Sequence, residues 1–155
     1  MEITCVDIPV EPIIIQKVSS WTVCIDNALH RFRRFRLPNE TGGVLLGSYD
    51  MERKLLYIVD MLSSPPDSEE WPTSYKRGCI GLAQAVREIQ DRTLMNLEYI
   101  GEWHSHPEGS GTGMSKIDDV AMKEIKGEMS KAGLPGLILI IESSGSYTPH
   151  LSEAE

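Results

Sequence analysis

The chain has 155 residues, of which 41% are hydrophobic and 25% are charged, and this composition excludes a disordered, collagen-like or disulfide-stapled protein. The length is that of one ordinary domain, so we expect residues 1–155 to form a single domain. The formal net charge of −8 disfavours a general attraction to phosphate backbones, and nucleic acid is therefore not an expected partner.

The N-terminal segment has no signature of secretion, because Glu2 and Asp7 stand where a signal peptide would be apolar and no basic region precedes them. The longest apolar run, residues 137–141, is too short to cross a bilayer as a helix, so no membrane partner is expected. The three cysteines are widely spaced and match neither a metal-binding pair nor a disulfide framework. Together these features favour a cytoplasmic location.

The first third of the chain predicts extended segments followed by a helix. Residues 3–10 and 12–18 are rich in β-branched side chains and predict two short strands or extended segments joined by a turn. Residues 23–35 predict the first helix, because arginines gather at the C-terminal end, where they suit the helix dipole, and because apolar side chains recur at helical spacing: Ile25, Leu29 and Phe32.

A β-hairpin and a long loop are expected next. The apolar runs 43–47 and 55–59 flank a polar turn and predict the hairpin. Residues 63–78 contain three prolines and show no periodicity, which predicts a long surface loop of the kind that often carries function. Trp71 in this loop is interpreted either as a binding contact or as an anchor to the core.

The second half alternates helices and strands. A helix is predicted around residues 82–89, a strand at 97–103, a helix at 115–131 and a last buried strand at 137–142. Strands interleaved with three helices predict an α/β (α+β) three-layer sandwich, a mixed β-sheet flanked by helices.

The strand that ends in Glu-Trp-His-Ser-His-Pro carries the candidate chemistry. Alternate side chains of a strand share a face, so His104 and His106 project the same way and two imidazoles can bind one ion. A catalytic zinc takes three protein ligands and leaves the fourth position to water. Asp118 is the candidate third ligand, because the glycine-rich loop 108–113 can bring the start of the next helix back over the two histidines.

Two further residues are candidates for catalysis. Glu40, directly before two glycines, fits the base that takes a proton from the attacking water and returns it to the leaving amine. The hydroxyl of Ser115 is placed to stabilise an oxyanion.

Each of these features also has a purely structural interpretation. Ser115-x-x-Asp118 is a capping-box pattern, and Glu40 alone is an ordinary acid beside a turn. Glu102 shares the strand face of the two histidines and is either a supporting acid behind the ligands, a rival base or a satisfied polar residue.

The order of these motifs resembles the JAMM (JAB1/MPN/Mov34) zinc metalloprotease family. The match comprises an acid before Gly-Gly-Val-Leu-Leu-Gly, then His-Ser-His-Pro, then Ser-x-x-Asp, over roughly residues 40–118. The resemblance implies an MPN/JAB domain with a cytidine-deaminase-like fold. It also implies one Zn²⁺ ion per chain bound by His104, His106 and Asp118, with Glu40 as the acid/base that contacts the metal through water and Ser115 as the oxyanion stabiliser.

The resemblance further implies a substrate class. The family cleaves peptide or isopeptide bonds after the C-terminal tail of ubiquitin or ubiquitin-like proteins. The Gly-Glu-Trp-His-Ser-His-Pro segment is most similar to short bacterial members, some encoded beside E1- and E2-like proteins in antiphage defence operons. The implied protein is a deubiquitinase-like hydrolase that acts on the conjugates of a ubiquitin-like tail, with E1-like and E2-like proteins as further partners.

One spacing departs from the family pattern. Eleven residues separate His106 from Asp118, about one more than is usual, and the glycine loop can absorb the extra residue; Asp119 is the alternative ligand. The alternatives in function are a peptidase that processes a sulfur-carrier protein in biosynthesis and a non-catalytic MPN scaffold. A zinc nucleoside deaminase would need a Pro-Cys-x-x-Cys ligand pair, which the sequence lacks.

Overall fold

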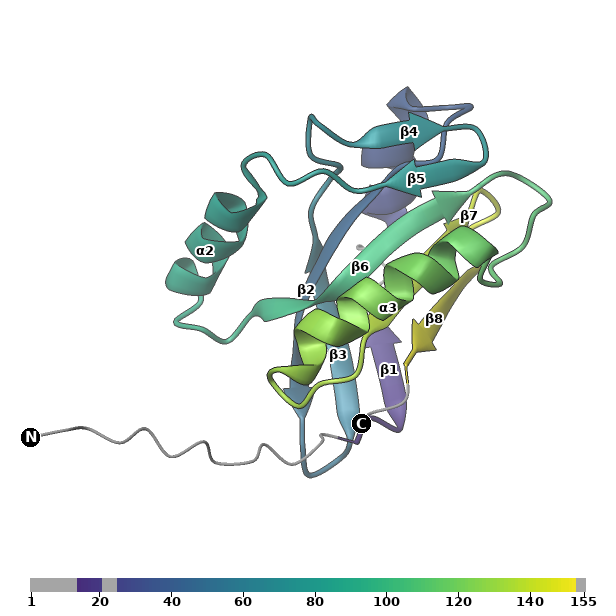
Figure 1. The fold of residues 1–155 in the computed structure, drawn as a ribbon. Helices are drawn as coiled ribbons and strands as arrows, with labels where there is room; N and C mark the ends of the chain where they lie inside the picture. The colour runs from purple at the N-terminus through teal and green to yellow at the C-terminus, as the bar shows by residue number, and fades with distance from the viewer. Residues whose placement is uncertain (1–13, 21–24, 153–155) are drawn as a thin grey trace, which may run out of the picture.

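A six-stranded mixed sheet forms the centre of the molecule in the computed structural model, which describes residues 14–20 and 25–152 (Figure 1). The strand order is β1-β3-β2-β6-β7-β8. β1 pairs with β3 and β6 with β7 in parallel, and the other neighbours are antiparallel. The strands are β1 (Lys17–Ser20), β2 (Gly42–Asp50), β3 (Leu55–Met61), β6 (Glu98–His106), β7 (Leu137–Glu142) and β8 (Tyr147–Leu151).

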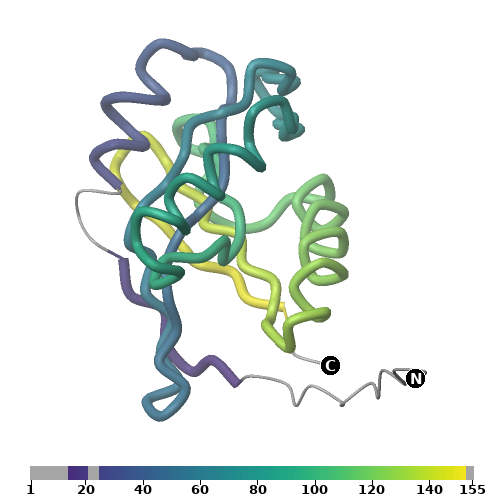
Figure 2. The backbone as a smooth tube through the Cα atoms, turned by 90° about the vertical axis from the view of Figure 1, so that its left-hand side faces the viewer, coloured from purple at the N-terminus to yellow at the C-terminus, as the bar shows by residue number. Residues whose placement is uncertain are grey.

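Helical segments cover both faces of this sheet, which confirms the predicted sandwich (Figure 2). On one face, the segment that begins at Ile25 packs its apolar side chains with Trp103 into the larger core cluster. On the other face, α3 (Lys116–Ser130) contributes Met122, Ile125 and Met129 to a second cluster with β7. Alternate residues of β7 belong to opposite clusters, because the side chains of a strand alternate between the two faces of its sheet.

The predicted helix around residues 82–89 is confirmed as α2 (Leu82–Arg92). It stands to one side of the sheet, near the start of β6 (Figure 1). None of its residues is buried, so its apolar stripe is only half covered.

Three predictions need correction. The segment predicted as an α-helix over residues 23–35 is a π-helix, η1 (Asn27–Phe32), followed by a 3₁₀ turn, η2 (Arg33–Phe35), while residues 23–24 lie outside the described part. The long loop contains a small hairpin of β4 (Glu69–Trp71) and β5 (Ser74–Lys76), whose three-residue strands are too short to show periodicity. β8 follows the strand that was predicted to be the last.

The N-terminal prediction is only partly covered by the structure. Residues 3–10, 12 and 13 lie outside the described residues, residues 14–16 have no regular secondary structure, and β1 begins at Lys17. The predicted hairpin at 43–47 and 55–59 is confirmed as β2 and β3.

A close contact at the start of β2 brings the small hairpin over the sheet. A Cβ atom added to Gly42 would lie 2.4 Å from the carbonyl oxygen of Trp103 and 2.4 Å from the ring of Tyr75. Glycine is therefore required where β5 packs against the ends of β2 and β6. The histidines of β6 lie at this same end of the sheet.

Candidate metal centre

His104 and His106, near the end of β6, meet the first turn of α3. The Nε2 atom of His104 lies 2.9 Å from Oδ1 of Asp118, and Nε2 of His106 lies 3.2 Å from Oδ2 of the same carboxylate. The two Nε2 atoms are 3.3 Å apart. Ligand atoms of all three residues lie within 4.8 Å of one another, and all three residues are buried, so this group could hold a metal ion.

Asp118 is fixed by the start of its own helix. Ser115 is the N-cap of α3, and its Oγ accepts a hydrogen bond from the amide of Asp118 at 3.2 Å. The Asp118 carboxylate in turn accepts one from the Ser115 amide at 2.6 Å, which completes a capping box. The structural interpretation of this pair is therefore correct, and it leaves Oδ1 directed at His104. Asp119 is exposed and stands outside the group of three.

The electrostatics of these residues are coupled. Burial opposes the ionisation of Asp118, but hydrogen bonds from His104 and His106 outweigh it and hold the pKa of this carboxyl well below its usual range. Burial likewise opposes a charge on His106, but the hydrogen bond to Asp118 and its negative charge raise the pKa of this imidazole. The contact between His106 and Asp118 thus shifts the pKa values of these two groups in opposite directions.

The glycine loop orients the second histidine. Nδ1 of His106 donates a hydrogen bond to the carbonyl oxygen of Gly111 at 3.1 Å, which directs Nε2 toward Asp118. Gly109 and Gly111 both have left-handed backbone conformations, with φ of +81° and +73°. The amide of Gly109 also donates to the carboxylate of Glu142 on β7 at 2.7 Å. The glycines therefore let an eleven-residue connection turn sharply while it holds an imidazole.

Glu40 lies beside the cluster, buried with 7% of its surface exposed. Burial raises the pKa of its carboxyl to about 7, opposed by the positive charge of His106 and reinforced by the negative charge of Asp118. Its amide donates to the carbonyl oxygen of Trp71 in β4 at 2.8 Å, while the Trp71 side chain is 60% exposed and so does not anchor the loop in the core.

A groove of about 770 Å³ runs along α3 and β6 and reaches His104 and Asp118. Glu102 lines it and forms an ion pair with Arg77, with 2.6 Å between Oε1 and the guanidinium Nε. This pairing favours the supporting structural role for Glu102 over the role of a rival base. Tyr75 of β5 lines the groove where it reaches the histidines, and its ring centroid lies 6.3 Å from that of His104.

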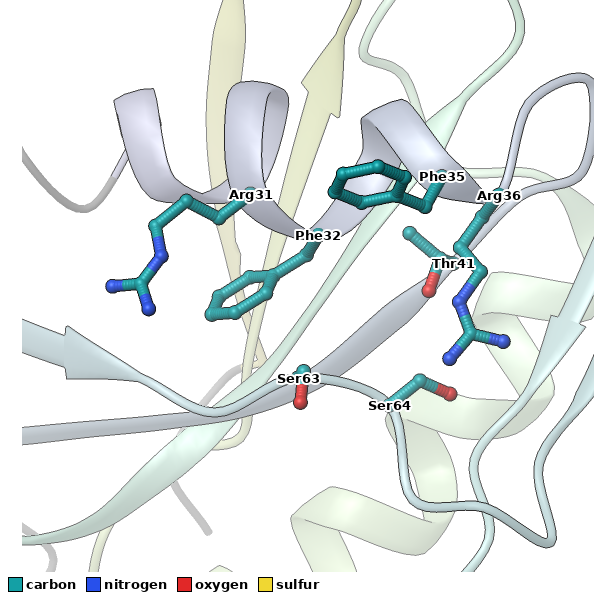
Figure 3. Close-up of a pocket in the computed structure, with 7 residues that line it drawn as sticks. All are labelled: Arg31, Phe32, Phe35, Arg36, Thr41, Ser63 and Ser64. Atoms are coloured by element: carbon teal, nitrogen blue, oxygen red, sulfur yellow. The ribbon is translucent and has the colours of Figure 1, made fainter.

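A second cavity lies on the opposite face of the sheet. It has a volume of about 200 Å³ and lies between the η1–η2 segment and the loop after β3. Figure 3 shows the side chains of Phe32 and Arg36 extending from that segment toward Ser63 and Ser64.

Sequence reasoning did not find two residues that contact the site, Tyr75 and Arg33. Tyr75 lies in the segment that was predicted to be an irregular loop, and Arg33 was grouped with the other arginines at the C-terminal end of the predicted helix. Arg33 is in fact buried, and its Nη2 donates to the carbonyl oxygen of His106 at 3.3 Å. The two strands of the hairpin have three residues each, so the sequence carries no periodicity that could have indicated them.

Comparison with known proteins agrees with this geometry. The family described as prokaryotic homologs of the JAB domain matches residues 25–149. A protein of Enterobacter hormaechei subsp. hoffmannii (strain UCI 50), named CD-NTase/cGAS isopeptidase, is 35% identical over 112 residues, which cover 71% of this chain and 60% of that protein. Within residues 14–20 and 25–152, no helix combines the length and the apolar character that a membrane crossing requires. The chain belongs to the family of prokaryotic homologues of the JAB domain.

Proposed function

We propose that this protein is a zinc-dependent isopeptidase that hydrolyses the bond after the C-terminal tail of a ubiquitin-like protein. The observation that carries the proposal is the meeting of two imidazole Nε2 atoms and one carboxylate at the end of a groove, with a second, buried carboxyl of raised pKa beside them. We propose that residues 1–155 form one domain and that this domain carries the whole catalytic site.

The donor set suits zinc. Two imidazole nitrogens and one carboxylate form a common three-ligand set for catalytic zinc, which leaves one position for water. The hydrogen bond from Nδ1 of His106 to Gly111 is the supporting contact that zinc-binding histidines usually make. His104, His106 and Asp118 are therefore the proposed ligands, and zinc, when bound, would polarise the scissile carbonyl and lower the pKa of a water molecule.

Glu40 is the proposed acid/base. A general base works best when its pKa lies near the operating pH, and burial brings the pKa of this carboxyl to about 7. As the carboxylate it accepts the proton of the attacking water, and as the acid it returns that proton to the leaving amine. Its hydrogen-bonded main chain, tied to Trp71, keeps it beside the ligand cluster during this exchange.

Ser115 is the proposed oxyanion stabiliser. Its Oγ already accepts a hydrogen bond from the Asp118 amide, which leaves the hydroxyl proton available for a substrate oxygen. The groove beside it would hold an extended tail, since its walls combine the apolar side chains Ile117, Val120 and Ile125 with the polar residues Glu102 and Arg77.

The relative named CD-NTase/cGAS isopeptidase supports a narrower substrate. We propose that the acceptor protein is a nucleotidyltransferase of the CD-NTase type, joined by an isopeptide bond to a ubiquitin-like tail, in a bacterial antiphage defence operon with E1-like and E2-like proteins. This chain spans 60% of that relative's length.

The test combines metal analysis with cleavage. Purified protein is analysed for zinc and then incubated with a CD-NTase conjugate of a ubiquitin-like protein, with release of the free acceptor measured by mass spectrometry. We expect one zinc per chain, cleavage after the terminal glycine, and loss of cleavage in Glu40→Gln with zinc retained. Cleavage at the wild-type rate by Glu40→Gln would refute the assignment, and protein without stoichiometric zinc would favour the non-catalytic scaffold.

A further inference from the structure

β2 and β6 separate at the end of the sheet that holds the candidate centre. The paired register of the two strands ends at Gly42 and His104. One residue further, the amide of Ser105 still donates to the carbonyl of Thr41 at 2.8 Å, but the Thr41 amide bonds to the Ser105 hydroxyl instead of a main-chain carbonyl. Beyond that point the amide of Glu40 bonds to Trp71 of the small hairpin. His106 therefore has no partner on β2, and its strand partner is Glu142 of β7 on the other side.

Arg33 makes a further contact with the main chain of His106. Its guanidinium Nη2 donates to the carbonyl oxygen of His106 at 3.3 Å, across 73 positions of sequence. Of the four arginines between residues 31 and 36, only this one is buried, with 7% of its surface exposed. In the described part of the chain, no carboxylate oxygen lies within 4.0 Å of its guanidinium nitrogens.

A buried arginine without a carboxylate partner carries a desolvation cost that its hydrogen bonds must offset, and the bond to the His106 carbonyl is one of these. The next residue after His106 is Pro107, which has no N–H group, so the peptide unit that joins them can be anchored only through the carbonyl of His106. The guanidinium of Arg33 is the side-chain donor that reaches this carbonyl. His106 is therefore held at its main chain by Arg33 and at its ring by Gly111.

We propose that Arg33 is a positioning residue for His106, which fixes the main chain of this ligand so that its Nε2 atom faces Asp118. The inference rests on the proposed function, because it treats His106 as a zinc ligand. Its Coulombic effect has the opposite sign: a positive charge near a divalent cation weakens binding, so removal of the charge alone would raise the affinity for zinc. A positioning role instead predicts a loss of affinity when Arg33 is replaced.

The experiment measures zinc affinity by competition with a chromophoric chelator in Arg33→Gln, Arg33→Lys and the control Arg34→Gln. Arg34 is exposed on the same turn, and its guanidinium lies 5.7 Å from the ring centroid of Phe35. Loss of a contact that orients a metal ligand typically weakens affinity about 10- to 100-fold, and we expect a loss in that range for Arg33→Gln. Arg34→Gln should bind zinc with the wild-type dissociation constant, and Arg33→Lys, which keeps the charge, should fall between them.

Circular dichroism of the metal-free proteins separates positioning from folding. A folded Arg33→Gln protein that binds zinc as tightly as the wild type, or more tightly, would overturn the proposal, as would an equal loss in Arg34→Gln. If Arg33→Gln does not fold, the lysine variant decides by the same criterion.

A second measurement does not depend on zinc. The ring and carbonyl NMR resonances of His106 in the metal-free protein should shift in Arg33→Gln or, if that variant does not fold, in Arg33→Lys, but not in Arg34→Gln. Unchanged resonances in the folded Arg33 variant would contradict the positioning role. A wild-type protein that binds no zinc would refute the proposed function, while these resonances would still decide whether Arg33 positions His106.

Discussion

Replacement of Glu40 by glutamine should make the metal-free protein more stable at alkaline pH while it abolishes catalysis. In the folded protein, burial raises the pKa of Glu40 from 4.5 to about 7. Because the folded-state pKa is the higher one, the contribution of this group to stability is complete below about pH 4.5 and is lost as the pH rises through about 7. Above that pH, an ionised carboxylate remains in a site that favours the neutral acid.

The size of this effect follows from the two pKa values. At 1.36 kcal/mol per pH unit, the difference between 4.5 and about 7 corresponds to at most about 3 kcal/mol of unfolding free energy. Solvent screening and the attraction to the positive charge of His106 reduce the expected difference to about 2 kcal/mol. Glutamine has nearly the same shape and no charge, so the variant should exceed the wild type by this amount near pH 8 and equal it near pH 4.5.

Urea unfolding of the metal-free proteins at both pH values measures this difference, with Glu52→Gln as the control. Glu52 is exposed in the turn between β2 and β3, so its replacement should leave the unfolding free energy unchanged. In the hydrolysis assay, loss of the base should lower kcat by about 10²- to 10⁴-fold. A Glu40→Gln protein no more stable than the wild type at alkaline pH would refute the account of a buried, destabilised carboxylate.

Three further outcomes are expected. Asp118→Asn should lose nearly all bound zinc while α3 persists, because the amide oxygen still accepts the Ser115 hydrogen bond. Elemental analysis and circular dichroism measure the two quantities, and the control Asp119→Asn should keep its zinc. Zinc lost from Asp119→Asn but kept by Asp118→Asn would contradict the ligand assignment. Removal of zinc by a chelator should stop hydrolysis and lower the midpoint of thermal unfolding. Re-addition of zinc at about 100 times its dissociation constant should restore about 2.7 kcal/mol of unfolding free energy. An unfolding midpoint that does not change with zinc in calorimetry would argue against a metal site in the folded protein. Gly42→Ala should destabilise the protein by about 1–3 kcal/mol, because its Cβ would lie 2.4 Å from a carbonyl oxygen. In the control Gly113→Ala the added Cβ meets open space, so the unfolding free energy should change little. Equal effects of the two variants in urea titrations would contradict the packing described at the start of β2.

The elements with strong local patterns could be predicted from the sequence. The β2–β3 hairpin has two apolar runs around a polar turn, and α3 has a capping box and an apolar stripe. Each element can therefore be recognised within a window of about 20 residues. The meeting of His104, His106 and Asp118 follows from strand alternation and from a loop able to reverse the chain.

The other parts depend on contacts between distant segments. β4 and β5 are too short to show periodicity, and they are held in place by bonds such as that from the Glu40 amide to Trp71. The π-helical geometry of residues 27–32 is likewise invisible in a spacing that fits an α-helix. Arg33 resembles its three neighbouring arginines in sequence, and only the packing of η2 against β6 distinguishes it.

The capping box at the start of α3 has a consequence for related chains. Asp118, or an asparagine in its place, would be retained by selection on helix stability even in a descendant that no longer needed metal, because either side chain would still satisfy the amide of Ser115. The presence of an aspartate at this position is thus weak evidence that a distant homologue is an active enzyme. Glu40 and the two histidines, whose side chains end no helix, are the residues whose loss would mark a lineage that has abandoned hydrolysis.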